Sequence, residues 1–91
     1  MKIVFSQKIR AKLATKHNVT EPEVYQCFEN REGGLLEDTR EKNKTSPPTQ
    51  WFIAYTNKMR ALKIVFVLVD GIIYLKTAYE PSQKEKDIYC K

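Results

Sequence analysis

The fold of this chain is decided by VFVLVDGIIYLKTAYEP, residues 65–81, which reads as two apolar strands folded back at Asp70-Gly71. Asp-Gly between two apolar runs is a strong hairpin signal, because a two-residue loop favours residues that tolerate positive φ. Such a loop sets four pairs of facing residues: Val69 with Ile72, Leu68 with Ile73, Phe66 with Leu75 and Ile64 with Thr77. The sequence therefore predicts a central antiparallel hairpin over residues 62–69 and 72–79.

The two faces of this hairpin differ in chemistry. The expected core face carries Leu62, Ile64, Phe66, Leu68, Ile73 and Leu75, with Thr77 and Tyr79 at its end. The opposite face carries Val65, Val67, Val69, Ile72, Tyr74 and Lys76. In a two-layer domain the helices cover one face of the sheet. We therefore expect the face with Tyr74 and Lys76 to be open to solvent.

The segments before the hairpin predict a short strand and a pair of helices. Residues 2–6 form the strand, and residues 7–17 form a helix with Ile9 and Leu13 on one side and Lys8, Lys12 and Lys16 on another. Asn18 suits the left-handed position that ends a helix. Thr20 and Glu23 then form a capping box that starts a second helix, which ends by about Asn30.

The rest of the chain completes one α+β domain over residues 1–91. Residues 35–41 are expected as an edge strand, 43–50 as a loop, 50–56 as an aromatic strand and 57–60 as a turn. Ser82 and Glu85 form a second capping box before a short C-terminal helix. The predicted fold has two layers: an antiparallel sheet of four to five strands packed on the N-terminal helix pair.

The composition indicates the cellular compartment that we expect for the protein. No apolar run approaches the roughly 18 to 20 residues of a membrane span, and the apolar part of MKIVFSQK is too short for a signal peptide. We expect a cytoplasmic chain without a membrane partner. Cys27 and Cys90 lack metal-ligand spacing, so we expect two reduced thiols, with Cys27 half-buried on a helix.

The net charge of +5 is unevenly distributed along the sequence. Residues 1–17 hold five bases and no acid, residues 18–41 hold seven acids against two bases, and residues 42–91 hold nine bases against four acids. Two basic segments around an acidic one predict a polarised surface that attracts a polyanion on one side. The alternative is that these charges only solvate the surface of a small basic protein.

Several residues are candidates for contacts with such a polyanion. Lys76 and Tyr74 lie two apart on one strand, where Lys76 suits a phosphate and Tyr74 suits stacking on a base. Lys58, Arg60 and Lys63 make a cationic hairpin end. For each of these residues, a solvated surface is the alternative interpretation.

Two longer stretches resemble the BrnT branch of the RelE-like superfamily of small bacterial toxins. KHNVTEPEV, residues 16–24, is similar to its Lys-His-Gly-Val-Ser-like helix end, with Asn18 in place of Gly and Thr20 in place of Ser. KTAYEPSQKEKDIY, residues 76–89, is similar to its last strand and charged helix. Tyr79 stands where BrnT-like chains carry Arg.

The resemblance implies cleavage of mRNA at a sheet face, without a metal or other cofactor, and an antitoxin-like protein as partner. Such cleavage needs a base for the ribose 2′-OH, a cation for the phosphorane charge and a proton for the leaving oxygen. Candidate catalytic residues are Lys76, Arg60, Tyr79 and His17, and candidate RNA-binding residues are Lys58, Lys63, Tyr74 and Lys76. His17 has an alternative as a cation at a helix end, and Tyr79 as a packing residue at the rim.

The alternative function is a non-catalytic interaction module, or degenerate toxin, that binds a protein partner or forms a homodimer. Similar short chains are often labelled ADP-ribosyl-(dinitrogen reductase) hydrolase. The enzyme of that name is all-helical and binds two metals through clustered aspartates, whereas this chain has only Asp38, Asp70 and Asp87. We therefore expect neither that activity nor a metal site.

Overall fold

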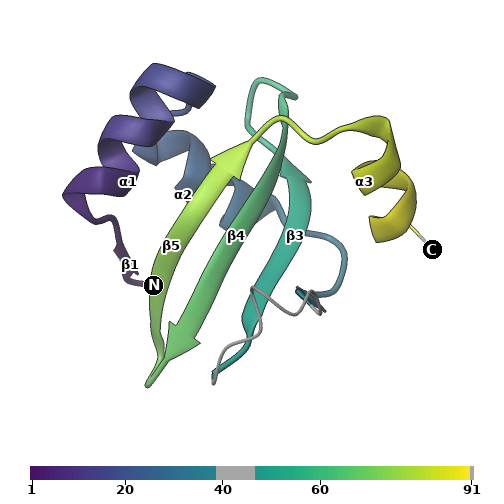
Figure 1. The fold of residues 1–91 in the computed structure, drawn as a ribbon. Coiled ribbons are helices and arrows are strands. Elements are labelled where there is room, and N and C mark those ends of the chain that lie inside the picture. Colours follow the sequence, from purple (N-terminus) through teal and green to yellow (C-terminus); the bar gives the residue numbers. More distant parts are fainter. Residues whose placement is uncertain (39–46, 91) are drawn as a thin grey trace.

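The computed structural model describes residues 1–38 and 47–90 and shows an α+β fold built on a five-stranded sheet. The strand order is β1-β5-β4-β3-β2 (Figure 1). The strands are β1 (Ile3–Val4), β2 (Leu36–Glu37), β3 (Thr49–Tyr55), β4 (Ala61–Val69) and β5 (Ile72–Tyr79). The sheet is mixed rather than antiparallel, because β1 runs parallel to β5. The fold class is thus confirmed at the level of an α+β domain.

The central hairpin forms as predicted at its loop and departs from the prediction further along. Asp70 and Gly71 have φ of 51° and 79°, and Val69 faces Ile72. A β-bulge then shifts the register, so that Ile64 faces Ala78 rather than Thr77, and Lys76 has no facing residue in β4. The predicted pairing of Ile64 with Thr77 is wrong because nothing in the local sequence marks the extra residue.

The bulge exchanges the faces at the end of β5. Ala78 is fully buried in the core, whereas Tyr79 faces Lys63 and Thr77 faces Val65 on the opposite side. The expected position of Thr77 and Tyr79 on the core face is therefore wrong. We call the face with Lys63, Val65, Val67, Tyr74, Thr77 and Tyr79 the outer face and the opposite one the inner face.

The inner face carries the hydrophobic core under the N-terminal helices. These are α1 (Gln7–Lys12), the π-helical turn η1 (Leu13–His17) and α2 (Glu21–Asn30). Leu13, Val24 and Cys27 pack with sheet residues such as Phe52 and Phe66, and all are at most 2% exposed. Leu68, expected in the core, is 43% exposed near the hairpin loop.

Local capping explains where these helices begin and end. Asn18 takes the left-handed conformation with φ 52°, as its sequence position predicts. Thr20 and Glu23 make both bonds of the predicted capping box, and α2 ends at Asn30. Because η1 and α2 are separated by three residues, the two helices stay close together on one side of the sheet.

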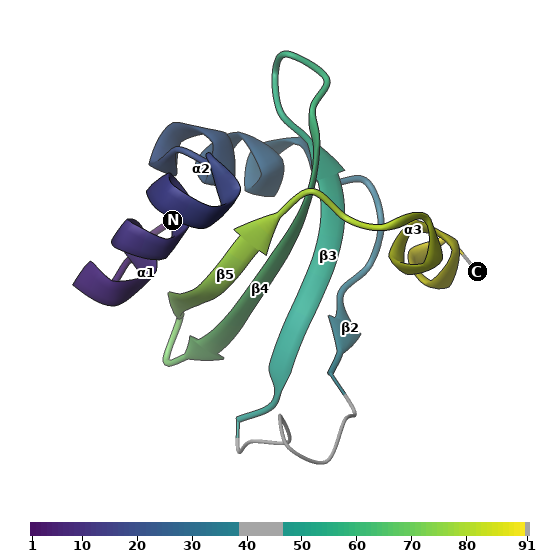
Figure 2. The same cartoon turned by 45° about the horizontal axis from the view of Figure 1, so that its top comes forward.

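The C-terminal helix α3 (Gln83–Tyr89) begins at the predicted capping box of Ser82 and Glu85. It lies on the other side of the sheet from α1 and α2 (Figure 2). The sheet is therefore covered by helices on its inner face and by α3 over one part of its outer face.

The segments at the β2 edge differ from the prediction. The strand expected over residues 35–41 is limited to Leu36–Glu37, and its residues 39–41 lie outside the described residues, as does the 43–46 part of the predicted loop. β3 begins at Thr49, inside the predicted loop. Both cysteines are free thiols, and Cys27 is fully buried rather than half-buried.

Candidate nucleic-acid interface

Four of the predicted site residues meet at one corner of the molecule, where β5 ends and β4 begins. The ring centroids of His17 and Tyr79 are 5.6 Å apart. Lys63 Nζ lies 5.7 Å from the centroid of the Tyr79 ring, and Arg60 Nη2 donates to the carbonyl oxygen of His17 at 3.1 Å. His17 reaches this corner because η1 packs against the end of β5, beyond the two residues that β1 covers.

Arg60 uses its guanidinium to join three segments. Nη1 donates to the carbonyl oxygen of Asn18 at 2.8 Å and to the carboxylate of Glu23 at 3.2 Å. Nε donates to Glu80 Oε2 at 2.9 Å. Two carboxylates and two carbonyl oxygens thus bind the guanidinium that the sequence analysis proposes for an RNA site, and the carboxylates neutralise its charge.

The same Glu23 carboxylate also completes the cap of α2. Burial acts to raise the pKa of Glu23, but the hydrogen bonds from the Thr20 amide and from Arg60 outweigh it, so that the pKa falls below its ordinary value. Glu23 is therefore ionised at neutral pH and holds Arg60 in place. This arrangement assigns Arg60 a structural position at the junction of η1, α2 and the β5–α3 connection.

Lys63 is also paired. Its Nζ donates to Glu85 Oε2 at 2.7 Å, and the Tyr79 hydroxyl donates to the same oxygen at 2.7 Å. Burial acts to raise the pKa of Glu85, but the bonds from Lys63, Ser82 and Tyr79 lower it to about 2. Burial and the bond to Glu85 raise the pKa of Tyr79. Tyr79 is therefore a neutral hydrogen-bond donor whose proton is already engaged.

At this corner, the His17 imidazole is the group with a nitrogen that lacks a hydrogen-bond partner in the described part of the chain. Burial lowers its pKa below 6.5, and the positive charges of Lys12 and Lys16 lower it further. Nε2 is a buried atom, and it has no hydrogen-bond partner among the described residues. Because Nε2 is buried, this neutral imidazole can accept a proton or a hydrogen bond from a ligand only once a neighbouring group moves aside.

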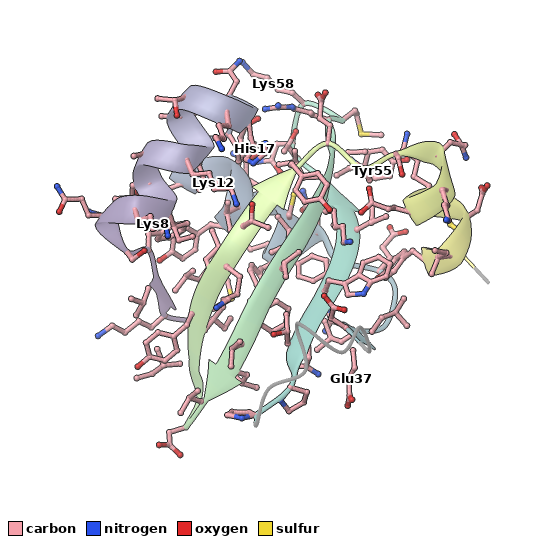
Figure 3. All side chains as sticks on the ribbon, viewed as in Figure 1. Lys8, Lys12, His17, Glu37, Tyr55 and Lys58 are labelled. Carbon is pink, nitrogen blue, oxygen red and sulfur yellow. The ribbon has the colours of Figure 1, made fainter. Side chains whose placement is uncertain are left out.

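The other predicted site residues lie apart from this corner. Tyr74 is 40% exposed on the outer face, beside the β1 end of β5. Lys76 is exposed at the β-bulge, and Lys58 is exposed in the turn between β3 and β4 (Figure 3). The structure thus places Tyr74 and Lys76 away from the helical layer, but it does not bring them into one cluster with Arg60 and Lys63.

Lysines of the first helix form a basic surface that the site prediction left out. Lys8 and Lys12 follow one another along α1 toward His17 (Figure 3), and Lys16 lies one turn further in η1. Over the described residues, no carboxylate lies within ion-pair distance of these three lysines or of Lys76 on the adjacent strand. Their regular i, i+4 spacing is visible in the sequence, but their lack of partners is not.

Several acidic residues lie away from these lysines. Glu29 and Glu32 line a cavity of about 1190 Å³ between the end of α2 and α3. Glu37 lies by β2, across the width of the sheet from Lys8 and Lys12 (Figure 3). Arg10, the remaining base of α1, is paired with Glu21 at 2.9 Å. The charge segregation along the sequence is therefore only partly preserved in space, because Glu21 lies against the helix that carries Lys8 and Lys12.

The described residues contain neither a metal-binding cluster nor a membrane-crossing helix. Among residues 1–38 and 47–90, no group of three or more His, Cys, Asp or Glu side chains is placed to hold a metal ion. Over the same residues, no helix has the length and apolarity to cross a membrane.

No protein-family model matches the chain, and no curated protein matches it either. The resemblance to the RelE-like superfamily, which the stretches at residues 16–24 and 76–89 suggest, therefore stays a prediction.

Proposed function

We propose that this chain binds single-stranded RNA through a lysine surface formed by Lys8, Lys12, Lys16 and Lys76. The observation that carries the proposal is the contrast between two sets of cations. Arg60 and Lys63 are neutralised by Glu23, Glu80 and Glu85, whereas over the described residues the four lysines have no acidic partner. Unpaired lysines attract phosphates and release counterions when they bind them.

Single-stranded RNA suits this surface better than a bare anion does. Tyr74 offers an exposed aromatic ring on β5, two residues from Lys76, and a base can stack on such a ring while the lysines hold the backbone. Glu29 and Glu32 at the end of α2 and Glu37 of β2 lie on other parts of the molecule and repel RNA there. We infer that the strand follows α1 and β5.

The test is the binding of a fluorescein-labelled dodecauridylate, measured by anisotropy at several salt concentrations. Four phosphate contacts predict a slope of log K against log salt of about −2.8 for a single strand. This slope corresponds to a loss of about 50-fold in affinity between 50 and 200 mM salt.

Lys12→Ala/Lys16→Ala should halve the slope to about −1.4. Lys84→Ala/Lys86→Ala on α3 is the matched control, because it removes the same charge from residues outside the lysine surface. Equal binding by the two double variants would refute the lysine surface. A salt-independent association of the wild type would refute RNA binding altogether.

We propose metal-independent cleavage of mRNA as a second candidate, on the basis of His17. Its neutral imidazole lies beside Tyr79, and its carbonyl binds the Arg60 guanidinium. In this candidate, His17 takes the proton from a ribose 2′-OH as that oxygen attacks the phosphorus, the cations stabilise the phosphorane, and the Tyr79 hydroxyl protonates the leaving 5′-oxygen, so that a 2′,3′-cyclic phosphate and a free 5′-hydroxyl are formed. A cleavage step of this kind requires Arg60 or Lys63 to leave its carboxylate partner, so we expect it to be slow.

Induction in bacterial cells, with mapping of mRNA 5′ ends, tests this candidate. The wild type should slow growth and produce new ends, and His17→Gln should abolish both effects while it retains RNA binding. Normal growth and unchanged mRNA ends on induction of the wild type would remove the cleavage candidate and leave RNA binding in place.

A further inference from the structure

The C-terminal helix α3 is attached to the sheet through two residues one helical turn apart. Glu85 accepts hydrogen bonds from Lys63 and Tyr79, both at 2.7 Å. The Tyr89 ring lies 5.8 Å from that of Trp51, and its hydroxyl donates to the carbonyl oxygen of Gly34 at 2.8 Å. No residue of α3 is buried, and Ile88 is 42% exposed. The helix therefore has little hydrophobic attachment.

Both flanks of α3 are hollow. An open groove of about 1190 Å³ lies between it and the end of α2, and a second open groove of about 560 Å³ lies between it and β2. A helix of seven residues has little stability of its own. Loss of the two attachments, of which Tyr89 packs against the core, would therefore release and unfold α3, whereas no residue of α3 belongs to the buried core itself.

Beneath α3 lies a lysine between two aromatic rings. Lys63 Nζ is 4.4 Å from the Trp51 ring and 5.7 Å from the Tyr79 ring. Lys63 and Trp51 are each only 8% exposed. A cation beside stacking surfaces on a sheet is the combination with which proteins bind single-stranded nucleic acids. In the closed arrangement, Glu85 places a carboxylate oxygen where a phosphate oxygen would meet Lys63 and Tyr79.

We propose that α3 is a displaceable cover over a nucleotide subsite formed by Lys63, Trp51 and Tyr79. A phosphate of single-stranded RNA replaces the Glu85 carboxylate on Lys63 and Tyr79, and the adjacent base stacks on Trp51. With α3 displaced, the subsite joins the exposed outer face around Tyr74, so that one strand of RNA reaches both. This inference rests on the proposed RNA binding and adds a covered subsite to it.

Glu85→Gln tests the cover, with Asp87→Asn as the matched control. The glutamine side chain preserves the capping box with Ser82 and removes the negative charge that holds Lys63. Asp87→Asn makes the same change in net charge on the same helix, at a residue whose side chain accepts a hydrogen bond from Gln83. Glu85→Gln should bind fluorescein-labelled dodecauridylate about fivefold more tightly than Asp87→Asn does. Addition of Lys63→Ala should abolish that gain.

Fluorescence supplies a second measurement, because Trp51 is the only tryptophan. In Glu85→Gln, the emission should shift to longer wavelength and acrylamide should quench it more strongly than in Asp87→Asn. If Glu85→Gln fails to fold by circular dichroism, Tyr89→Ala takes its place, since it removes the other attachment and leaves Lys63 paired. It should then show the same shift and a gain in affinity.

The outcomes separate this inference from the proposed function. Binding by the wild type that depends on Lys12 and Lys16, with no gain in folded Glu85→Gln or Tyr89→Ala over Asp87→Asn, would overturn the cover and leave the lysine surface standing. A complete lack of binding by the wild type and all variants would overturn both. A gain in affinity that survives Lys63→Ala would also overturn the subsite.

Discussion

Arg60→Ala should cause a large loss of stability, although Arg60 belongs to a basic turn at the surface. Its guanidinium is the only group that joins the end of η1, the start of α2 and the β5–α3 connection in the described residues. The alanine variant leaves the carbonyl oxygens of His17 and Asn18 without their donor. It also leaves the Glu23 and Glu80 carboxylates without a cation between them.

The magnitude follows from the individual contacts. A hydrogen bond from a charged donor contributes about 1.5 kcal/mol at the low end, so the two carbonyl acceptors together account for about 3 kcal/mol. The pair with Glu23 adds about 0.5 kcal/mol, and the pair with Glu80, which is 66% exposed, adds almost nothing. Since Arg60 itself is 25% exposed, water replaces part of these contacts. We expect a net loss of about 2–3 kcal/mol.

Urea denaturation followed by Trp51 fluorescence and circular dichroism measures this loss. A domain of this length has roughly 5–14 kcal/mol of stability, and about 2–3 kcal/mol lowers its melting temperature by roughly 10–20 °C. Arg60→Lys should lose about half as much, because one ammonium group cannot reach all three segments.

The matched control is Arg10→Ala, which breaks the ion pair with Glu21 between side chains that are 59% and 41% exposed. It should change the free energy of unfolding by about 0.5 kcal/mol or less. If Arg60→Ala and Arg10→Ala have equal stability, the structural assignment of Arg60 is refuted.

Four further predictions follow from other parts of the molecule. Glu85 has a pKa of about 2 against an ordinary 4.5, so its contribution to stability is complete above about pH 5 and is lost as the pH falls toward 2. In Glu85→Gln, the urea midpoint should therefore depend less steeply on pH over this range than in the wild type. Parallel curves of midpoint against pH for the two proteins would contradict the pairing with Lys63. In an NMR titration, the pKa of His17 should lie below 6.5, rise in Lys12→Ala/Lys16→Ala and rise again with RNA bound; an RNA-insensitive pKa would remove His17 from the interface. Ellman's reagent should label only Cys90 in the native protein, because Cys27 is buried with its pKa raised to about 12, and two rapidly labelled thiols would show that the core opens. Gly71 has φ 79°, so Gly71→Ala should lower the free energy of unfolding by about 1 kcal/mol in thermal melts. Met59 has φ 65°, so Met59→Gly should raise the free energy of unfolding by about 0.5–1 kcal/mol. Changes of the opposite sign would show that neither turn is limited by its backbone conformation.

Features that depend on neighbouring residues were predictable from the sequence. The Asp70-Gly71 loop and the two capping boxes each involve groups at most three residues apart, and all three form as expected. The chemistry of a short segment fixes such features before the rest of the chain is placed.

Features that depend on distant packing were not predictable. The β-bulge puts Ala78 into the core and moves Tyr79 to the outer face, and only the space beneath the helices decides between the two registers. Arg60 has partners at residues 17, 18, 23 and 80, and none of them is near it in the sequence. The sequence identified the basic residues correctly but could not distinguish paired cations from free ones.

The extra residue at Lys76 also has a consequence for how this strand can change. It shifts the alternation of side chains in the strand by one residue, so that odd-numbered residues face inward before it and even-numbered residues face inward after it. Deletion of that single position would remove the bulge and leave a regular ladder, in which Leu75 and Ala78 still face the packed interior and Thr77 and Tyr79 still face outward. Loss of one codon at this position should therefore be tolerated by the core, whereas loss of a neighbouring codon that leaves Lys76 in the ladder would replace one of these facing residues.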